Sequence, residues 1–208
     1  MKNADLQIVL ASSSPRRRDL LKTLGVHFQV VIPDIEEKPR DGEAPEAYVK
    51  RNSMEKSSAV ASGLDSNQLG TCLVVAADTV VVLGSDILEK PLNHDHAFDM
   101  LSSLSGKEHQ VYSGVTLSYF CKSEGWKERT FSVCTSVRIK NLQAEEIRSY
   151  IQSGEPLDKA GSYAAQGLGS YMVESIHGSY ANVVGLPVAQ VLQELESAFG
   201  LTLWDLRS

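Results

Sequence analysis

A run of twelve mostly apolar residues, Cys72–Leu83, with a single carboxylate, Asp78, inside it, constrains the fold of this chain most. A continuous Val-rich run is typical of a strand that is covered on both faces. It is too short, and too interrupted by Asp78, to span a bilayer. At 208 residues the chain is long enough for one domain with a sizeable core. The run therefore predicts a buried central strand.

The segments around this run have alternating strand-like and helix-like patterns. Further strands are predicted at residues 6–11, 28–32, 110–120, 129–139 and 171–176. Helices are predicted at about residues 15–24, 45–61, 94–105, 142–151 and 188–199. Because hairpins occur among the helices, we expect an α/β fold with a mixed sheet rather than a purely parallel one.

Composition excludes several classes of protein. The net charge of −6 disfavours binding nucleic acid by bulk electrostatics. The N-terminal residues have a short apolar patch followed by charge, the reverse of a signal peptide. Three widely spaced cysteines, Cys72, Cys121 and Cys134, suggest core residues rather than disulfides or a zinc site. We therefore expect a cytoplasmic protein that does not interact with membranes.

Three consecutive arginines, Arg16, Arg17 and Arg18, follow a serine-rich turn at the start of a predicted helix. Ser14, followed by proline, suits the N-cap, so the arginines fall where the helix dipole is already positive. A bound anion reverses this electrostatic cost. The guanidinium groups, the backbone N–H groups and the hydroxyls of Ser12–Ser14 together suit a phosphate. The alternative is a solvated start of a surface helix.

Asp78 is the second unusual feature, because a buried carboxylate is costly unless it is paired or bound to a metal. The alternative, that the strand ends before Asp78, is disfavoured by the apolar residues that continue after it. A carboxylate near a phosphate site suits either a Mg²⁺ ligand or a base that activates water. Glu36 and Glu37, in an acidic loop, are candidates to complete the metal site; otherwise they are surface charges.

Three lysines are candidate partners for phosphate: Lys56, Lys90 and Lys159. Each is otherwise a solvated surface residue. Lys90 precedes a proline, and Lys159 lies in a glycine-rich loop of the kind that often carries binding residues. In the same loop, Tyr163 is able to offer a stacking surface and Gln166 an amide; the alternative is that both only fill the loop.

These features occur together in one order along the chain. The segments LASSSPRRRDLL, DIEEKP, AADTVVVL, LEKP, LSGKEHQVYSGV, GEPLDKAGSYAAQGLG and SYANVVGLPV resemble the Maf family of nucleoside triphosphate pyrophosphatases, from about Gln7 to Leu195. The resemblance implies one Maf-like domain over residues 1–208, with two lobes around a central cleft and a long twisted mixed sheet, related to the inosine triphosphate pyrophosphatases. It also implies cleavage between the α and β phosphates with a divalent cation, Mg²⁺, Mn²⁺ or Co²⁺.

The resemblance also assigns roles to residues that match the family's motifs. Asp78 is the catalytic residue, and it shares the metal with Glu37. The residues that bind substrate and phosphate are Ser12, Arg16, Arg17, Lys56 and Lys90. The specificity positions are Arg16, Thr79 and Gln166. The chain departs from the family at Arg18, an additional basic residue, and at Ala164–Ala165, where relatives often have Gly–Ile.

The predicted function is a house-cleaning hydrolase that acts on dTTP and UTP or on modified pyrimidine nucleotides, because the loop around Gln166 resembles the pyrimidine branch of the family. One alternative is a 7-methyl-GTP pyrophosphatase. Another is a non-catalytic nucleotide-binding regulator of cell division, which needs the same phosphate contacts. The expected partner is a nucleoside triphosphate, without nucleic acid or membrane, and the resemblance suggests a homodimer.

Overall fold

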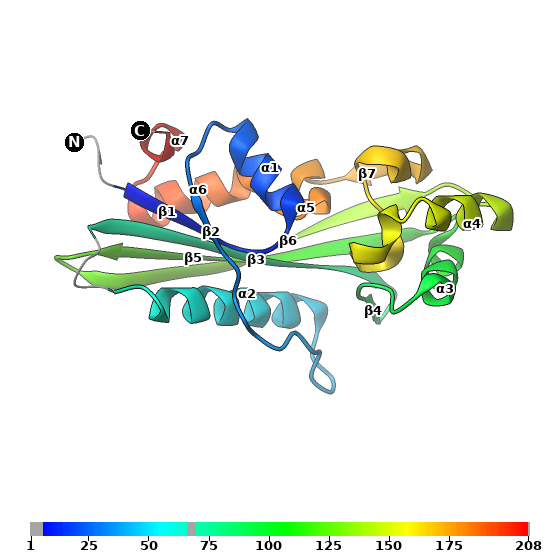
Figure 1. The fold of residues 1–208 in the computed structure, drawn as a ribbon, viewed down its shortest axis with the longest axis horizontal. Helices are drawn as coiled ribbons and strands as arrows, with labels where there is room; N and C mark the ends of the chain where they lie inside the picture. The colour runs from blue at the N-terminus through cyan, green and yellow to red at the C-terminus, as the bar shows by residue number, and fades with distance from the viewer. Residues whose placement is uncertain (1–5, 66–69, 208) are drawn as a thin grey trace. The chain divides into compact units, whose positions relative to one another are not determined.

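The computed structural model describes residues 6–65 and 70–207 (Figure 1). Its first elements are β1 (Leu6–Ala11), α1 (Pro15–Thr23), β2 (Gln29–Val31), α2 (Pro45–Ser62), β3 (Thr71–Leu83), β4 (Asp86–Leu88) and α3 (His94–Leu104). Next come β5 (Glu108–Cys121), β6 (Gly125–Ile139), α4 (Ala144–Gln152) and the 3₁₀ turns η1 (Glu155–Asp158), η2 (Ala160–Ser162) and η3 (Gly167–Met172). The last elements are β7 (Val173–His177), α5 (Tyr180–Val184), α6 (Val188–Phe199) and α7 (Leu203–Leu206).

The strands form one mixed sheet in the order β2-β1-β3-β5-β6-β7, with β4 paired to β3. Strand β1 is parallel to both β2 and β3, whereas β4 is antiparallel to β3 and β7 is antiparallel to β6. The three-residue turn between β5 and β6 makes these neighbours an antiparallel hairpin. The predicted mixed α/β class is therefore confirmed.

The chain divides into two compact units. The first comprises the described residues of Met1–Asp78, Ser113–Val133 and Gly185–Ser208. The second comprises Thr79–Tyr112 and Cys134–Val184. The single domain with a central cleft stays a prediction.

The side chains of β3 point alternately to the two faces of the sheet in the first unit. Leu73, Val75 and Ala77 share a core cluster with residues of α1 and α6, such as Leu21 and Leu195. The intervening residues of β3 pack with Val60 of α2 in a separate cluster. Figure 1 accordingly shows α2 on one side of these strands and α1 and α6 on the other. Because successive side chains point to opposite faces, Asp78 belongs to the face that α2 covers.

The second unit has a core of its own, in which the strand residues Val137 and Ile139 pack against α3 and α4. Leu101 and Leu104 lie on the buried face of α3, and Ile147 lies on that of α4. This unit also contains the loop between α4 and β7. That loop, predicted from its glycines, is organised into three 3₁₀ turns.

Local details differ from the sequence expectations. The short helices α5 and α7 were not predicted, because four or five residues carry no recognisable periodicity. Ser14 does stand at the N-cap of α1, but its side chain makes no capping hydrogen bond. All three cysteines are free, and Cys72 is buried in the core as expected; Cys121 is partly exposed and Cys134 is exposed, so the assignment to the core was wrong for these two.

Within residues 6–65 and 70–207, none of the helices is both long and apolar enough to span a membrane. The first five residues, on which the expectation about a signal peptide partly rested, lie outside the described part of the chain.

The contact between β5 and α2 tests this packing. A Cβ atom at Gly114 would lie 2.2 Å from the carbonyl oxygen of Val49 and 2.3 Å from its carbon, so Gly114→Ala must push the backbone of α2 away from β5. We expect a loss of about 1–3 kcal/mol in the free energy of unfolding, measured by urea denaturation. Gly63→Ala is the control, because Gly63 has a φ of −84° and its nearest contact would be at 3.5 Å. Equal unfolding midpoints for the two variants would contradict the close contact.

Candidate active site

Strand β3 and helix α2 together position the buried carboxylate of Asp78, which is only 6% exposed. Asn52 and Lys56 lie four residues apart on α2 and therefore on one helix face. Nζ of Lys56 donates a hydrogen bond to Oδ1 of Asp78 at 2.8 Å. Nδ2 of Asn52 donates to Oδ2 at 2.8 Å. Both carboxylate oxygens are thus satisfied by one face of one helix, which explains how the apolar strand tolerates the charge.

Lys56 also joins a second carboxylate to this group. Its Nζ lies 2.6 Å from Oε2 of Glu37, in the loop before α2. The side chain of Lys56 is 7% exposed, whereas that of Glu37 is 45% exposed. One buried ammonium therefore lies between a buried and an accessible carboxylate. Of the two acidic-loop candidates, Glu36 instead forms an ion pair with Lys38 at the surface.

The charges around Asp78 decide its protonation state. Burial raises the pKa of Asp78, but Lys56, the Asn52 amide and Arg17 together outweigh burial, so the pKa lies below its ordinary value. Asp78 is therefore ionised at neutral pH. It can accept hydrogen bonds or a proton, and it can attract a cation.

The turn after β1 supplies further charge at the same place. Because Ala11 pairs with Ala76, the turn that begins at Ser12 lies level with the residues leading to Asp78. The buried guanidinium of Arg17 donates from Nε to the carbonyl oxygen of Gly185 at 2.8 Å, and from Nη1 to Oγ of Ser12 at 3.0 Å. The same Oγ accepts the N–H of Ser14 at 3.2 Å. Arg17 thus both shapes this turn and contributes positive charge near Asp78.

The structure brings together five of the predicted site residues in the first unit: Ser12, Arg17, Glu37, Lys56 and Asp78. Arg16, the neighbour of Arg17 in α1, is partly exposed. The remaining three belong to the second unit: Thr79 in β3, Lys90 after β4 and Gln166 between η2 and η3. Lys90 and Gln166 are exposed, and Thr79 is partly exposed.

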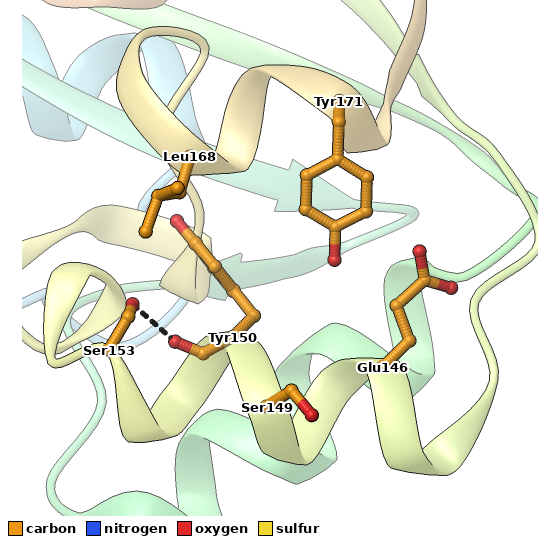
Figure 2. A pocket seen from close by; sticks show the side chains of 6 residues that line it. All are labelled: Glu146, Ser149, Tyr150, Ser153, Leu168 and Tyr171. Atoms are coloured by element: carbon orange, nitrogen blue, oxygen red, sulfur yellow. Dashed lines mark hydrogen bonds between the residues drawn. The ribbon is translucent and has the colours of Figure 1, made fainter.

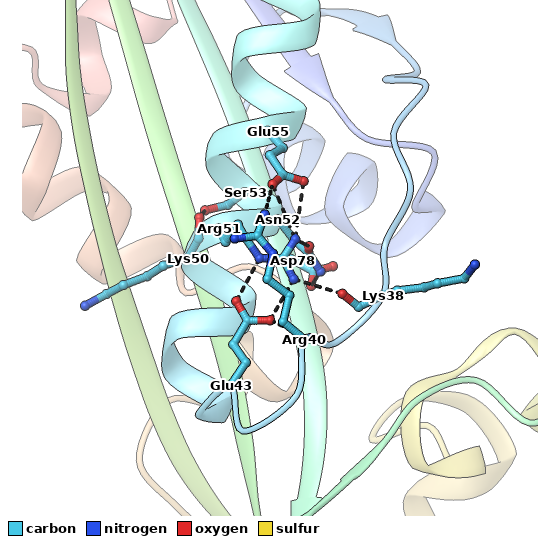
Figure 3. A network of polar contacts seen from close by, with 9 residues as sticks. All are labelled: Lys38, Arg40, Glu43, Lys50, Arg51, Asn52, Ser53, Glu55 and Asp78. Carbon is cyan, nitrogen blue, oxygen red and sulfur yellow. Dashed lines mark hydrogen bonds and ion pairs between the residues drawn. The ribbon is translucent and has the colours of Figure 1, made fainter.

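A polar network around Arg51 was not identified from the sequence (Figure 3). Arg51 binds both carboxylate oxygens of Glu43 at 2.7 Å. It also donates to the carbonyl oxygen of Lys38 at 2.9 Å and to Oδ1 of Asn52 at 3.2 Å. Arg51 therefore connects the loop next to Glu37 with Asn52, whose amide donates a hydrogen bond to Asp78. Its only sequence signal was a cluster of opposite charges, which is more often a solvated surface.

Two candidates from the glycine-rich loop have other roles. Tyr163 is buried, and its hydroxyl lies 2.8 Å from Nε2 of His109, so the expectation of an accessible stacking surface was wrong. Burial lowers the pKa of His109 to about 4 and keeps it neutral. Lys159 donates to the carbonyl oxygen of Glu155 at 2.5 Å and to Asp158 at 2.6 Å, so it stabilises the loop.

A hollow of about 290 Å³ in the second unit has a different chemistry (Figure 2). It is lined by Glu146, Ser149, Tyr150, Ser153, Leu168 and Tyr171. Because these six include a carboxylate and no lysine or arginine, the hollow does not suit a triphosphate.

Comparison with known proteins shows the family of this chain. The family model described as Maf-like protein matches residues 7–198. The chain belongs to the Maf family. It is 47% identical over 202 residues to a protein of Myxococcus xanthus named dTTP/UTP pyrophosphatase, covering 97% of both chains. A protein of the same name from Syntrophus aciditrophicus is 43% identical, covering 94% of this chain and 92% of the relative.

Among solved structures, the chain is similar to the Ham1 protein of Staphylococcus aureus, with a TM-score of 0.44 and 16% identity over 80% of this chain and 79% of that one. The sheet described above, rather than this similarity, establishes the fold class. The expected homodimer and cytoplasmic location stay predictions.

The Glu43–Arg51 pair makes a pH-dependent contribution to stability. The hydrogen bonds from Arg51 are the largest influence on Glu43 and lower its pKa to about 2. The ionised pair therefore stabilises the fold fully above the unfolded pKa of about 4.3, and this contribution is lost as the pH falls towards about 2.

We expect Glu43→Gln to lower the free energy of unfolding by about 1–2 kcal/mol at pH 7. The difference from the wild type should shrink on acidification, as measured by urea denaturation at several pH values. Glu46→Gln is the control, because Glu46 is 54% exposed and its pair with Lys50 should contribute about 0.5 kcal/mol or less. A difference for Glu43→Gln that grows as the pH falls would contradict this account.

Proposed function

We propose that this chain is a nucleoside triphosphate pyrophosphatase that hydrolyses dTTP and UTP to the monophosphate and pyrophosphate. The observation that carries the proposal is the buried, ionised Asp78, held by Lys56 and Asn52 beside the basic turn of Ser12 and Arg17. The names of the relatives agree with it. The proposal adds the cleavage site and the roles of individual residues.

The first task of the site is to hold a polyanion. The guanidinium of Arg17 is preorganised by the Gly185 carbonyl and by Ser12, so little side-chain entropy is lost when a phosphate approaches. We assign the phosphate contacts to Ser12, Arg16 and Arg17 in the first unit, together with Lys56 and with Lys90 of the second unit. Such charge stabilisation by prepositioned groups is the main contribution to phosphoryl-transfer catalysis.

The second task is to activate water. Because Asp78 is ionised, it can take a proton from a water molecule as the water oxygen bonds to the α phosphorus. The bridging P–O bond then breaks and pyrophosphate leaves. Lys56 is positioned to orient the carboxylate during this step, since it already binds Oδ1.

A divalent cation fits the chemistry of these residues. The described residues contain no group of three or more His, Cys, Asp or Glu side chains arranged as a metal site. However, Mg²⁺ is commonly held by one or two carboxylates together with substrate phosphates. Glu37 and Asp78, which already share the positive charge of Lys56, are such a pair. A cation bound there would neutralise charge on the triphosphate.

Base selectivity is assigned to Arg16, Thr79 and Gln166. Uracil and thymine present an N–H donor flanked by carbonyl acceptors, and the amide of Gln166 can offer both an acceptor and a donor. The positively charged 7-methylguanine suits a carboxylate better. The proposal therefore favours pyrimidine triphosphates over 7-methyl-GTP.

The direct test is pyrophosphate release from a panel of nucleoside triphosphates with Mg²⁺, Mn²⁺ or Co²⁺. We expect Asp78→Asn to reduce kcat/KM for dTTP by about 10²–10⁴. The variant should fold, because the side-chain oxygen of asparagine can still accept the hydrogen bond from Lys56, and Lys56 remains paired with Glu37. Asp19→Asn, at an exposed position of α1, is the control with unchanged activity. Near-normal turnover by folded Asp78→Asn would refute its role, and nucleotide binding without turnover by the wild type would favour a regulator.

A separate prediction concerns the base. Wild-type kcat/KM should be well above the purine values for both dTTP and UTP, and Gln166→Glu should reduce the preference over 7-methyl-GTP by about ten- to a hundredfold. Gln193→Glu, on the exposed side of α6, should leave the preference unchanged. A wild-type preference for 7-methyl-GTP would overturn the pyrimidine assignment and leave the pyrophosphatase proposal standing.

A further inference from the structure

The carboxylate of Glu155, at the start of η1, accepts three hydrogen bonds in the second unit. Oε2 accepts the hydroxyl of Tyr150 at 2.8 Å and the backbone N–H of Gly169 at 2.8 Å. Oε1 accepts the backbone N–H of Leu168 at 3.0 Å. The carboxylate therefore connects α4 to the segment that directly follows Gln166.

Tyr150 extends this connection to the other side of Gln166. While its hydroxyl donates to Glu155, the same oxygen accepts the backbone N–H of Ala164 at 3.2 Å. Figure 2 shows the hydroxyl end of Tyr150 directed from α4 towards Leu168. The short segment Ala165–Gly167 is thus tied at both of its ends, by one carboxylate and one phenol. We call these two residues the Glu155–Tyr150 clasp.

The backbone around the clasp is closely packed. A Cβ atom at Gly169 would lie 2.6 Å from the carbonyl oxygen of Ala164 and 2.6 Å from the hydroxyl of Tyr150. The two ends of the segment therefore approach each other as closely as glycine allows. Lys159 further holds Glu155 through its carbonyl oxygen. The loop that carries Gln166 has little freedom to change shape while the clasp is intact.

The clasp requires that the side chain at position 155 accepts hydrogen bonds and has no hydrogen to donate. All three groups that point at Glu155 are donors, and an ionised carboxylate is an acceptor only. Burial raises the pKa of Glu155, but the hydrogen bonds from Tyr150, Gly169 and Leu168 lower the pKa by a larger amount. The group is therefore ionised at neutral pH. Burial and the contact with Glu155 raise the pKa of Tyr150 and keep its proton in place.

We propose that Glu155, acting through Tyr150 and the backbone of residues 164–169, is a positioning residue that sets where Gln166 presents its amide to the nucleobase. This inference rests on the proposed function, in which Gln166 reads the base. Discrimination by hydrogen bonds depends on geometry, because a misplaced amide leaves buried donors and acceptors unpaired. Catalysis at Asp78 uses none of these groups, so the clasp controls selectivity rather than the chemical step.

Glu155→Gln tests the clasp with almost no change in shape. The new NH₂ group must face at least one of the three groups that donate to Glu155. At least one hydrogen bond is therefore replaced by a repulsive contact between two donors. We expect the ratio of kcat/KM for dTTP to that for GTP to fall at least about tenfold, mainly through a higher KM for dTTP. The amide hydrogens of Leu168 and Gly169 should exchange faster with solvent. Glu145→Gln, at an exposed position of α4, is the matched control and should change neither quantity.

The two measurements separate the outcomes. If Glu155→Gln speeds amide exchange at Leu168 and Gly169 but leaves the dTTP/GTP ratio of kcat/KM unchanged, the positioning role is overturned. Amide exchange that is as slow as in the wild type overturns it as well. If Glu155→Gln does not fold, Tyr150→Phe removes one donor and should lower the ratio about threefold; an unchanged ratio again overturns the proposal. Absence of dTTP hydrolysis by the wild type refutes the proposed function itself, and the exchange rates still show whether Glu155 holds the loop.

Discussion

The pairing of Asp78 with Lys56 is the interaction on which the first unit depends. An ionised carboxylate inside an apolar strand is tolerated only if donors reach it, and both donors come from α2. This requirement determines which face of α2 meets the sheet, since positions 52 and 56 must point inward. It also requires the helix to lie close to the sheet, and Gly114 permits that approach by leaving room for the backbone of Val49.

The same arrangement gives the site its chemical character. Lys56 lies between Asp78 and Glu37, and Arg17 is held nearby by Ser12 and by a backbone carbonyl. Charges of both signs are therefore already desolvated and oriented before a ligand arrives. A triphosphate with its cation presents complementary charges of both signs, which is why a preorganised site of this kind suits phosphoryl transfer. The Glu155–Tyr150 clasp applies the same principle to a loop.

Several site residues were predictable because they break a local rule. Asp78 interrupts an apolar run, and Arg17 adds positive charge to a helix N-terminus, and the structure brings these two charges close together. The Arg51–Glu43 pair breaks no rule, since opposite charges near one another are usual at surfaces, and so it was missed. Tyr163 was misjudged for the converse reason: a glycine-rich loop suggests exposure, whereas the loop folds onto His109.

The sequence by itself determined the order of the longer strands and helices, the covered central strand and the family, because hydrophobic periodicity and short motifs are local properties. Tertiary structure alone decided which partners the buried charges have. Lys56 and Asp78 are 22 residues apart, and Arg17 reaches a carbonyl 168 residues away. Periodicity specifies the face on which a side chain lies but not what lies opposite it, so these pairings exist only once helices and strands have packed together.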